Sequence, residues 1–390
     1  MSYQKKLDQL AEIGRLRSFS AHNRLGGAVI ERNGKSFINL SSNDYLGLAG
    51  DVDLQKNFYK DIADTYGSAF LDTFGLGSAS SRLLTGDYNN SHALETILAV
   101  AYGAESALLF NSGYHANIGI LPTLARKGDL ILSDKLNHAS LHDGLQLSQA
   151  TCKRFRHRDY EQLRDLLERY RSDYKRVFIV SESVFSMDGD VADIVKLVVL
   201  KKEYECILYL DEAHGVGVYG ATGLGRAEEC GFLTEVDLLI GTFGKAYASV
   251  GAYCICSAEI RSYLVNHSRS LIFTTALPAV THAWNLFVFE HVMGLTTKRK
   301  YLAKISTMLR ESIREAGLVT AGSTNIVPVI IGEDKQTLHL ANKMQQRGFY
   351  ILPVRPPTVP LGTARFRLSL GANMKWHDLE NLATCIAEQQ

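Results

Sequence analysis

Three side chains that could act on one ligand follow two apolar segments in the middle of the chain. Asp211 and His214 follow residues 206–210, and Lys245 follows residues 236–241. If both segments are strands of an open parallel sheet, they end at the same edge, where ligands bind. We therefore expect Asp211, His214 and Lys245 to converge on one ligand.

The surroundings of Lys245 favour covalent chemistry. Gly244 and Ala246 leave room for a bulky group to approach the amine. A partly buried lysine loses part of its affinity for a proton, and the neutral amine can form a Schiff base with an aldehyde. A buried carboxylate such as Asp211 would keep a pyridine nitrogen protonated, so that the ring withdraws electrons from a carbanion, and His214 would reach a ring substituent. The combination suits an aldehyde cofactor with a pyridine ring.

A phosphate-binding loop is predicted at Ser112 and Gly113, which lead into a helical pattern. The N-terminus of a helix attracts anions because its first backbone N–H groups have no partner within the helix. Taken singly, each feature has a simpler explanation, because a lysine after a strand is usually solvated and an aspartate there usually caps a helix. Their occurrence together favours a functional site.

Three other motifs indicate different chemistry, and each lacks a required part. Residues 215–220 (GVGVYG) match the pattern of a nicotinamide-dependent oxidoreductase, but Gly-rich residues 221–225 follow where a helix is required. Residues 211–214 (DEAH) resemble a helicase motif, but no complete Walker A loop accompanies them. His138 and His142 have an i, i+4 spacing that could suit zinc, but no third ligand is evident. We expect no metal site, and the oxidoreductase stays a remote alternative.

Composition and charge exclude several classes of protein. Of the 390 residues, 46% are hydrophobic and 21% charged, as in a globular chain. With 42 Lys and Arg against 41 Asp and Glu, there is no electrostatic reason to expect nucleic acid or a membrane as partner. No apolar run could cross a bilayer, no signal peptide is evident, and the six scattered cysteines form no disulfide framework. We therefore expect a cytoplasmic protein.

Apolar segments of strand length alternate with helical patterns from about residue 90 onward. Continuous apolar strands are typical of a sheet covered on both faces, so the pattern predicts an α/β fold with a mostly parallel sheet. The predicted strands are 106–110, 129–133, 176–180, 206–210, 236–241 and 251–257, and helices are predicted at 4–17, 92–101, 160–170 and 281–294.

Three parts of the chain are predicted from changes in this pattern. Residues 1–45 combine an N-terminal helix with a short extended pair around Val29 and Phe37. Residues 46–280 would form a large ligand-binding domain. Residues 281–390 would form a smaller α+β domain, with strands at 326–331 and 365–370.

Several longer motifs resemble one enzyme family. They are residues 242–246 (TFGKA), 181–190 (SESVFSMDGD), 211–217 (DEAHGVG) and 41–48 (SSNDYLGL). Together they resemble the α-oxoamine synthases, pyridoxal-phosphate enzymes of fold type I, over nearly the whole chain. The resemblance implies a fold-type I transferase with a central sheet of the seven-stranded type, and pyridoxal phosphate as cofactor.

The resemblance also implies a role for each matching residue. Lys245 would hold the cofactor covalently and then remove the Cα proton of an amino acid, Asp211 would pair with the ring nitrogen, and His214 would bond to the ring hydroxyl. His138 would stack on the ring and also contact the substrate. Further cofactor contacts are implied for Ser112, Gly113, Tyr114, Glu182, Ser186, Thr242, Thr274 and Thr275, and substrate contacts for Arg17, Asn43, Thr358 and Arg367.

Finer features resemble one branch of the family. Residues 355–367 (RPPTVPLGTARFR) and Gly215 are similar to the branch that condenses L-alanine with a pimeloyl thioester, on coenzyme A or an acyl carrier protein, in biotin biosynthesis. Arg367 would clamp the alanine carboxylate, because a guanidinium pairs with a planar anion through two hydrogen bonds. Sibling enzymes that use glycine or serine stay an alternative. Thr274 and Thr275 resemble a segment that reaches a neighbouring subunit's cofactor, which implies a homodimer.

Overall fold

The computed structural model describes residues 2–389, apart from the side chains of residues 71 and 72, and the chain divides into two compact units. The central unit comprises Val52–Phe185 and Val191–Thr296. The terminal unit comprises the residues up to Asp51, Ser186–Asp190 and the residues from Thr297 onward. The two units therefore meet along the chain at 51/52 and 296/297. The domain boundaries expected from the sequence, at 45/46 and 280/281, stay a prediction.

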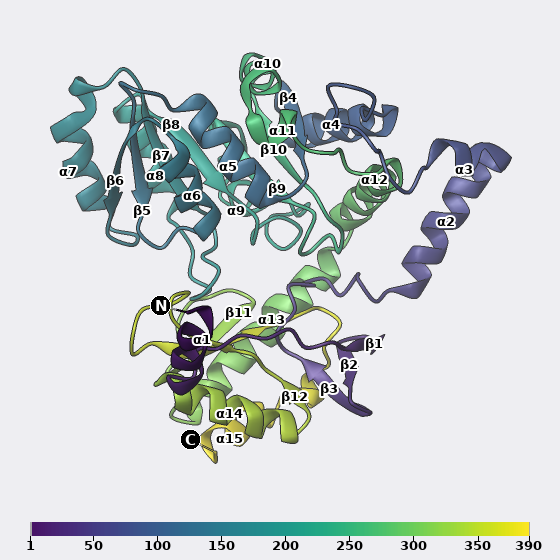
Figure 1. The fold of residues 1–390 in the computed structure, drawn as a ribbon, viewed down its shortest axis with the longest axis vertical. Helices are drawn as coiled ribbons and strands as arrows, with labels where there is room; N and C mark the ends of the chain where they lie inside the picture. The colour runs from purple at the N-terminus through teal and green to yellow at the C-terminus, as the bar shows by residue number, and fades with distance from the viewer. Residues whose placement is uncertain (1, 390) are drawn as a thin grey trace. The chain divides into compact units, whose positions relative to one another are not determined.

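A seven-stranded sheet forms the middle of the central unit (Figure 1). Its order is β4-β10-β9-β8-β7-β5-β6, and only β10 runs antiparallel to its neighbours. The mostly parallel sheet is thus confirmed. The strands are β4 (Ser106–Phe110), β5 (Leu130–Asp134), β6 (Thr151–Phe155), β7 (Val177–Glu182), β8 (Ile207–Asp211), β9 (Leu238–Thr242) and β10 (Ala252–Cys256).

Both faces of this sheet are covered. Phe178 and Val180 on β7 belong to one apolar cluster with residues of α5 (Gly113–Leu124) and α6 (Ala139–Leu147). Val177 and Ile179 point to the opposite face, because side chains alternate along a strand, and they are just as buried. The continuous apolar runs that predicted these strands therefore reflect burial on two sides.

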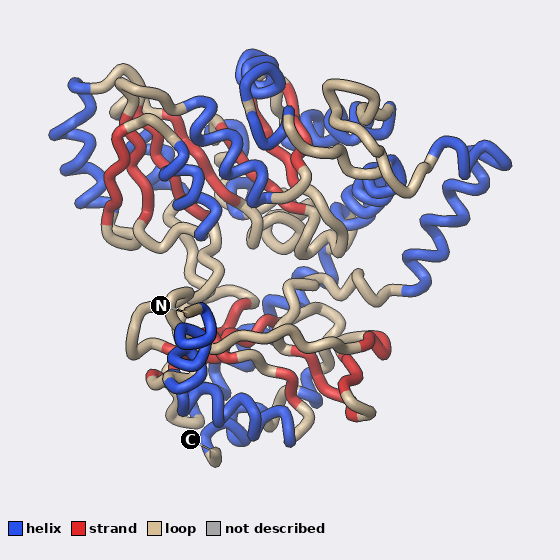
Figure 2. The backbone as a smooth tube through the Cα atoms, in the orientation of Figure 1, coloured by secondary structure: helices blue, strands red, loops and turns tan. Residues whose placement is uncertain are grey.

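Most other helices of the central unit lie beside the sheet, whereas α2 (Val52–Tyr66) and α3 (Phe70–Thr73) extend away from it, as Figures 1 and 2 show. Gly103, in the left-handed conformation at φ 62°, ends the predicted helix before β4. The remaining helices are α4 (Asn89–Tyr102), α7 (Tyr160–Tyr170), α8 (Ile194–Glu203), α9 (Arg226–Glu229), α10 (Ala258–His267), α11 (Arg269–Ile272) and α12 (Ala279–Met293).

The terminal unit joins both ends of the chain in one sheet. The N-terminal hairpin continues into β12 through a parallel pairing of Ile38 with Phe349, and a second sheet has the order β11-β14-β13. Ile30, Phe37 and Tyr350 pack together across the first sheet. The elements are α1 (Tyr3–Glu12), β1 (Asn23–Gly26), β2 (Val29–Arg32), β3 (Lys35–Asn39), α13 (Thr296–Glu315), β11 (Ile326–Gly332), α14 (Asp334–Gln346), β12 (Phe349–Tyr350), β13 (Pro353–Val354), β14 (Ala364–Ser369) and α15 (Leu382–Ala387).

Two local predictions differ from the structure. The N-terminal helix ends at Glu12 rather than Arg17, because Gly14 adopts a φ of 71°, which a helix does not allow. Strand β6 was not predicted, since its polar sequence TCKRF lies at the sheet edge and is mostly exposed. Within residues 2–389, no helix is long and apolar enough to span a membrane.

Candidate active site

The carboxyl edge of the central sheet carries a row of polar side chains. Thr242 ends β9, Asp211 ends β8, Glu182 ends β7, and His138 follows β5, so the four residues come from four neighbouring strands. Glu182 and Asp211 are direct register partners in the parallel pairing of β7 with β8. The structure thus brings together residues that lie up to about a hundred positions apart in sequence.

Lys245 joins this row from the loop that follows β9. Its Nζ donates to Nε2 of His214, at 2.9 Å, and the lysine is half-buried while His214 is buried. The predicted convergence of Lys245 and His214 is therefore observed. An amine held in this position is accessible to a ligand and is already oriented by a neighbour.

Asp211 is 5% exposed, and each of its two oxygens accepts one hydrogen bond. Oδ1 accepts from the backbone N–H of Ala213 at 2.9 Å, and Oδ2 accepts from the side-chain amide of Asn117 at 2.8 Å. A carboxylate oxygen has room for further donors. Asp211 is therefore fixed in place and can still receive a proton donor from a ligand.

Glu182 is buried beside Asp211 without a full set of partners. Its Oε1 has no hydrogen-bond partner in the described part of the chain. Burial, and next the negative charge of Asp211, raise the pKa of Glu182 well above its ordinary value. Because an unpaired buried oxygen is costly, this atom indicates that the site is completed by a bound group.

His138 caps the N-terminus of α6 and keeps much of its ring exposed. Its Nδ1 accepts from the backbone N–H of Ser140 at 3.2 Å. Partial desolvation by the surrounding protein lowers its pKa from the ordinary 6.5, the charge of Lys245 lowers it further, and the charge of Asp211 opposes both. A neutral, flat ring with one exposed surface suits stacking on an aromatic ligand.

The predicted phosphate end lies at the start of α5. Ser112 caps this helix by accepting from the backbone N–H of His115, at 3.2 Å. A methyl group on Gly113 would lie 4.0 Å from the Thr242 side chain, so the helix start is next to the end of β9. Tyr114 donates to Asp143 on α6, at 2.5 Å.

Thr274 and Thr275 lie beside Asn111, the residue before Ser112. The side-chain amide of Asn111 donates to Thr274 Oγ1 at 3.3 Å and to the Thr275 carbonyl at 2.6 Å. Both threonines are therefore close to the helix start within the same chain. Their contact with a neighbouring subunit's cofactor stays a prediction.

A second group of predicted residues gathers within the terminal unit around Arg367 on β14. The guanidinium donates to the Ser186 carbonyl, to Asn43 Oδ1 at 3.0 Å and to the Tyr45 hydroxyl at 3.2 Å. Tyr45 also donates to Asn43, at 3.1 Å, and burial raises the pKa of its hydroxyl. These bonds, with a longer one to Ser369 Oγ at 3.5 Å, fix the planar head of Arg367, which stays half-exposed and can meet an anion.

Arg17 and Thr358 meet each other in the same unit. Arg17 donates to Thr358 Oγ1 at 3.0 Å, and both residues are exposed. They are therefore available to a ligand, whereas their predicted contact with substrate is not tested by this pairing.

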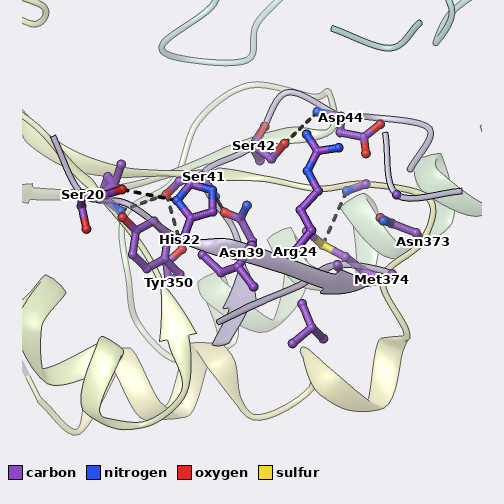
Figure 3. A pocket seen from close by; sticks show the side chains of 18 of the residues that line it. Ser20, His22, Arg24, Asn39, Ser41, Ser42, Asp44, Tyr350, Asn373 and Met374 are labelled. Carbon is purple, nitrogen blue, oxygen red and sulfur yellow. Dashed lines mark hydrogen bonds between the residues drawn. The ribbon is translucent and has the colours of Figure 1, made fainter. Parts of the chain in front are cut away.

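A separate hollow of about 410 Å³ also lies in the terminal unit (Figure 3). Ser42 and Asp44 line it, but Asn43 between them does not, since it bonds to Arg367 instead. The predicted substrate residues therefore do not belong to this hollow. Its wall includes Ser20, His22, Arg24, Asn39, Tyr350 and Asn373.

The Gly-rich motif after His214 has a structural explanation. Residues 215–225 form turns rather than a helix, with Gly217 N–H bonded to the Gly223 carbonyl at 2.7 Å, so the dinucleotide interpretation is rejected as predicted. A side chain at Gly215 or Gly225 would collide with the carboxyl group of Glu212. These glycines therefore make room for a buried carboxyl.

The residues of the central unit fit an aldehyde cofactor with a pyridine ring and a phosphate. A lysine amine, a fixed carboxylate and an exposed imidazole are grouped at one sheet edge, and a helix N-terminus lies at the end of the neighbouring strand. The unpartnered Oε1 of Glu182 is the observation that argues most directly for a missing ligand.

Comparison with known proteins identifies the family. Residues 35–386 match the family model of class I and II aminotransferases. The chain therefore belongs to the class I and II aminotransferase family, which agrees with the fold-type I architecture predicted from its sequence.

Individual relatives narrow this to the α-oxoamine synthases. The 8-amino-7-oxononanoate synthase of Chlorobaculum parvum is 49% identical, covering 92% of this chain and 91% of its own. The 8-amino-7-oxononanoate synthase of Haemophilus ducreyi is 48% identical over 99% of this chain and 100% of its own length. Serine palmitoyltransferase from Sphingomonas wittichii superposes with a TM-score of 0.90 at 32% identity, covering 100% and 98%. The predicted membership of the α-oxoamine synthases is confirmed.

Two further solved structures are similar. A serine palmitoyltransferase with PLP has a TM-score of 0.90 at 28% identity, covering 100% of this chain and 98% of that one. The 8-amino-7-oxononanoate synthase of Francisella tularensis has a TM-score of 0.74 at 28% identity, covering 90% and 97%.

Three residues at these sites were not predicted from sequence. Tyr45 lies inside the SSNDYLGL motif, so its contact with Arg367 had a visible signal. Asn117 and Ser140 contact Asp211 and His138 respectively, but nothing in their spacing marks them, because they come from two different helices.

Proposed function

We propose that this chain condenses L-alanine with a pimeloyl thioester to give 8-amino-7-oxononanoate, carbon dioxide and a free thiol, with pyridoxal phosphate as cofactor. The observation that carries the proposal is the grouping of Lys245, His214 and Asp211 at one sheet edge. The choice of substrates follows the relatives that are about half identical over most of the chain.

The cofactor, when bound, supplies an aldehyde for the amino group of alanine and a ring that withdraws electrons from its Cα. Lys245 anchors the cofactor and, once released, its amine removes the Cα proton. Asp211, held by Asn117 and Ala213, would accept from the ring N–H of the bound cofactor. His214, whose Nε2 lies 2.9 Å from Lys245 Nζ, would contact the ring oxygen.

The remaining roles concern binding of the substrate. Arg367, oriented by Ser186, Asn43 and Tyr45, binds the alanine carboxylate. Cα then bonds to the acyl carbon, the thiol leaves, the carboxylate departs as carbon dioxide, and Cα takes up a proton. Arg17 and Thr358 contact the substrate. Ser112, Gly113 and Thr242 hold the phosphate end.

A sibling activity with serine or glycine is the second candidate. It is favoured by the TM-score of 0.90 to serine palmitoyltransferase, against 0.74 to the Francisella tularensis 8-amino-7-oxononanoate synthase. Sequence identity argues the other way, at 32% to the serine palmitoyltransferase and 48–49% to the relatives named 8-amino-7-oxononanoate synthase. We therefore rank the alanine reaction first.

The test is a titration of the holoenzyme with L-alanine, glycine and L-serine, followed by visible absorbance. We expect a yellow protein whose spectrum responds best to L-alanine, and a product of the mass of 8-amino-7-oxononanoate when a pimeloyl thioester is added. A response led by glycine or serine would support the sibling activity. A colourless protein that takes up no pyridoxal phosphate would refute both.

We further propose a homodimer that works in the cytoplasm. Light scattering of the purified holoenzyme tests the first part, and a mass of one chain would contradict it. Parallel assays with pimeloyl-coenzyme A and the pimeloyl carrier protein identify the acyl donor.

A further inference from the structure

A chain of four hydrogen bonds, three of them buried, centres on Asn117, a residue of α5. The Tyr209 hydroxyl donates to Asn117 Oδ1 at 2.6 Å. The Asn117 amide donates to Asp211 Oδ2 at 2.8 Å and to Ser140 Oγ at 2.9 Å. Ser140 Oγ lies 2.8 Å from Nδ1 of His138. One carboxamide therefore connects the residue expected at the ring nitrogen with the residue expected on the ring face.

The chemistry of the partners fixes the direction of each bond. A carboxylate only accepts, so the amide nitrogen of Asn117 must face Asp211 and its oxygen must face Tyr209. Ser140 accepts from Asn117, so its own hydrogen is available for His138. Nδ1 of His138 also accepts from the Ser140 backbone, which leaves the imidazole proton on Nε2.

The fold brings these residues together through a close approach of two helices. A methyl group on Gly144 of α6 would lie 2.5 Å from the backbone oxygen of Asn117, so only glycine allows α6 this close to α5. Ser140 is one turn before Gly144 and therefore reaches the Asn117 side chain. Asn117, Ser140 and Tyr209 are at most 2% exposed, so water does not replace the three bonds that Asn117 makes.

We propose that Asn117 is a positioning residue that sets two groups of the site at once. It holds the Asp211 carboxylate at the angle needed for a ring N–H and, through Ser140, keeps His138 in the tautomer whose Nε2–H faces outward. This inference rests on the proposed function. It adds one residue that orients both Asp211, expected at the ring nitrogen, and His138, expected on the ring face. None of the site residues predicted from sequence has this role.

The main test is Asn117→Asp, which keeps the shape of the side chain and places a second carboxylate against Asp211. We expect affinity for pyridoxal phosphate about tenfold to a hundredfold below wild type at pH 8, recovering toward pH 6 as the two carboxylates share a proton. Glu182, His138 and Tyr209 interact with the charge of Asp211, and Lys245, which is bonded to His214, interacts with Glu182 and His138. A second carboxylate acts on these groups as well, so the predicted change is in the pH profile of the whole cluster.

Asn266→Asp is the control, because it adds the same charge at an exposed position of α10. Its cofactor affinity should follow the wild-type pH profile. An Asn117→Asp protein with the affinity and pH profile of wild type would overturn the proposal. A wild-type protein that binds no pyridoxal phosphate would instead refute the proposed function.

A second measurement needs no cofactor and stays informative if Asn117→Asp folds poorly. Nitrogen-15 NMR of the apoprotein with labelled histidine should show His138 protonated on Nε2, its signal being assigned by loss in His138→Gln. In Ser140→Ala, the hydroxyl bonds to His138 and to Asn117 are lost, whereas the backbone N–H of residue 140 can still donate to Nδ1. We therefore expect the Nδ1 signal of His138 to shift, because Nδ1 loses the shorter of its two bonds. Ser91→Ala is the control, since this buried hydroxyl has no partner in the described chain. An unaltered His138 signal in Ser140→Ala would overturn this half of the proposal.

Discussion

At the scale of single residues, the site depends on a few polar groups held in buried positions. Lys245, Asp211 and Glu182 lie together, and each has a neighbour that affects its charge or orientation. Groups of titratable side chains brought together in this way are typical of functional sites. Substitutions of single side chains should therefore have separable effects on turnover, on cofactor binding and on stability.

Lys245→Ala should lose turnover by several orders of magnitude while still binding pyridoxal phosphate weakly. The substitution removes both the covalent link and the base, whereas the contacts of Asp211 and Ser112 stay in place. Single-turnover assays and cofactor titration measure the two effects separately. Lys202→Ala, at an exposed ion pair with Glu235, is the control and should keep wild-type activity. Near-normal turnover in Lys245→Ala would refute the assigned role.

Glu212 should make stability depend on pH. Burial raises its pKa from 4.5 to about 6, although the Ser183 hydroxyl and the Ala227 N–H donate to it. Because the folded state then binds the proton more tightly than the unfolded state, this contribution is present below pH 4.5 and is lost as pH rises through about 6. It amounts to about 2 kcal/mol.

The measurement is the melting temperature of wild type against Glu212→Gln, from about pH 4.5 to pH 7. Glutamine does not titrate, so wild type should lose stability relative to the variant as pH increases. A difference that stays constant across this range would show that Glu212 has an ordinary pKa.

At the scale of elements, the site depends on helices packed closely against the sheet. The start of α5 lies beside the end of β9, and α6 approaches α5 where Gly144 has no side chain. The loop before α6 is fixed to β7 because Asn137 donates to the Val180 carbonyl at 2.9 Å and accepts from Glu182 N–H at 3.1 Å. The position of His138 is thus determined by the packing of the secondary structure.

Gly144→Ala should destabilise the central unit by about 1–3 kcal/mol, because the new methyl group would be too close to the Asn117 backbone oxygen. Urea unfolding measures this loss. Gly294→Ala is the matched control, since its methyl group would lie 3.6 Å from its nearest neighbour, an ordinary contact. Equal stability of Gly144→Ala and wild type would show that α6 can move away at no cost.

At the scale of the whole molecule, the terminal unit is assembled from distant parts of the chain. Phe37 packs edge-on against Tyr350, with ring centroids 6.1 Å apart, and β3 pairs with β12. The N-terminal hairpin therefore lacks a stable sheet until the C-terminal residues are present.

A chain that ends at Gly348 should lose this support. We expect proteases to cleave residues 29–39 readily in this variant, while the central unit stays protected, as measured by limited proteolysis with mass spectrometry. A chain without residues 2–12 is the control, because α1 has no buried residues and should not affect the hairpin. Continued protection of residues 29–39 in the shortened chain would contradict the prediction.

Sequence predicted the parts of this molecule that depend on local pattern. The apolar runs located six of the seven strands of the central sheet, and their ends placed Asp211 and Lys245 at one edge. Strand β6 was missed because an exposed edge strand needs no apolar run. The bond from Asn117 to Asp211 joins residues 94 positions apart, and no local pattern encodes a contact set by helix packing.

The order of the central sheet has a consequence for how the protein is made. Strand β4 is the first strand of this sheet to leave the ribosome, yet its one neighbour in the sheet is β10, and Phe110 pairs with Ala252. At a synthesis rate of ~5–20 residues per second, β4 waits about seven to thirty seconds for that partner. During this interval an apolar strand edge is open to wrong pairing, so the nascent chain is most prone to aggregate before residue 252 emerges.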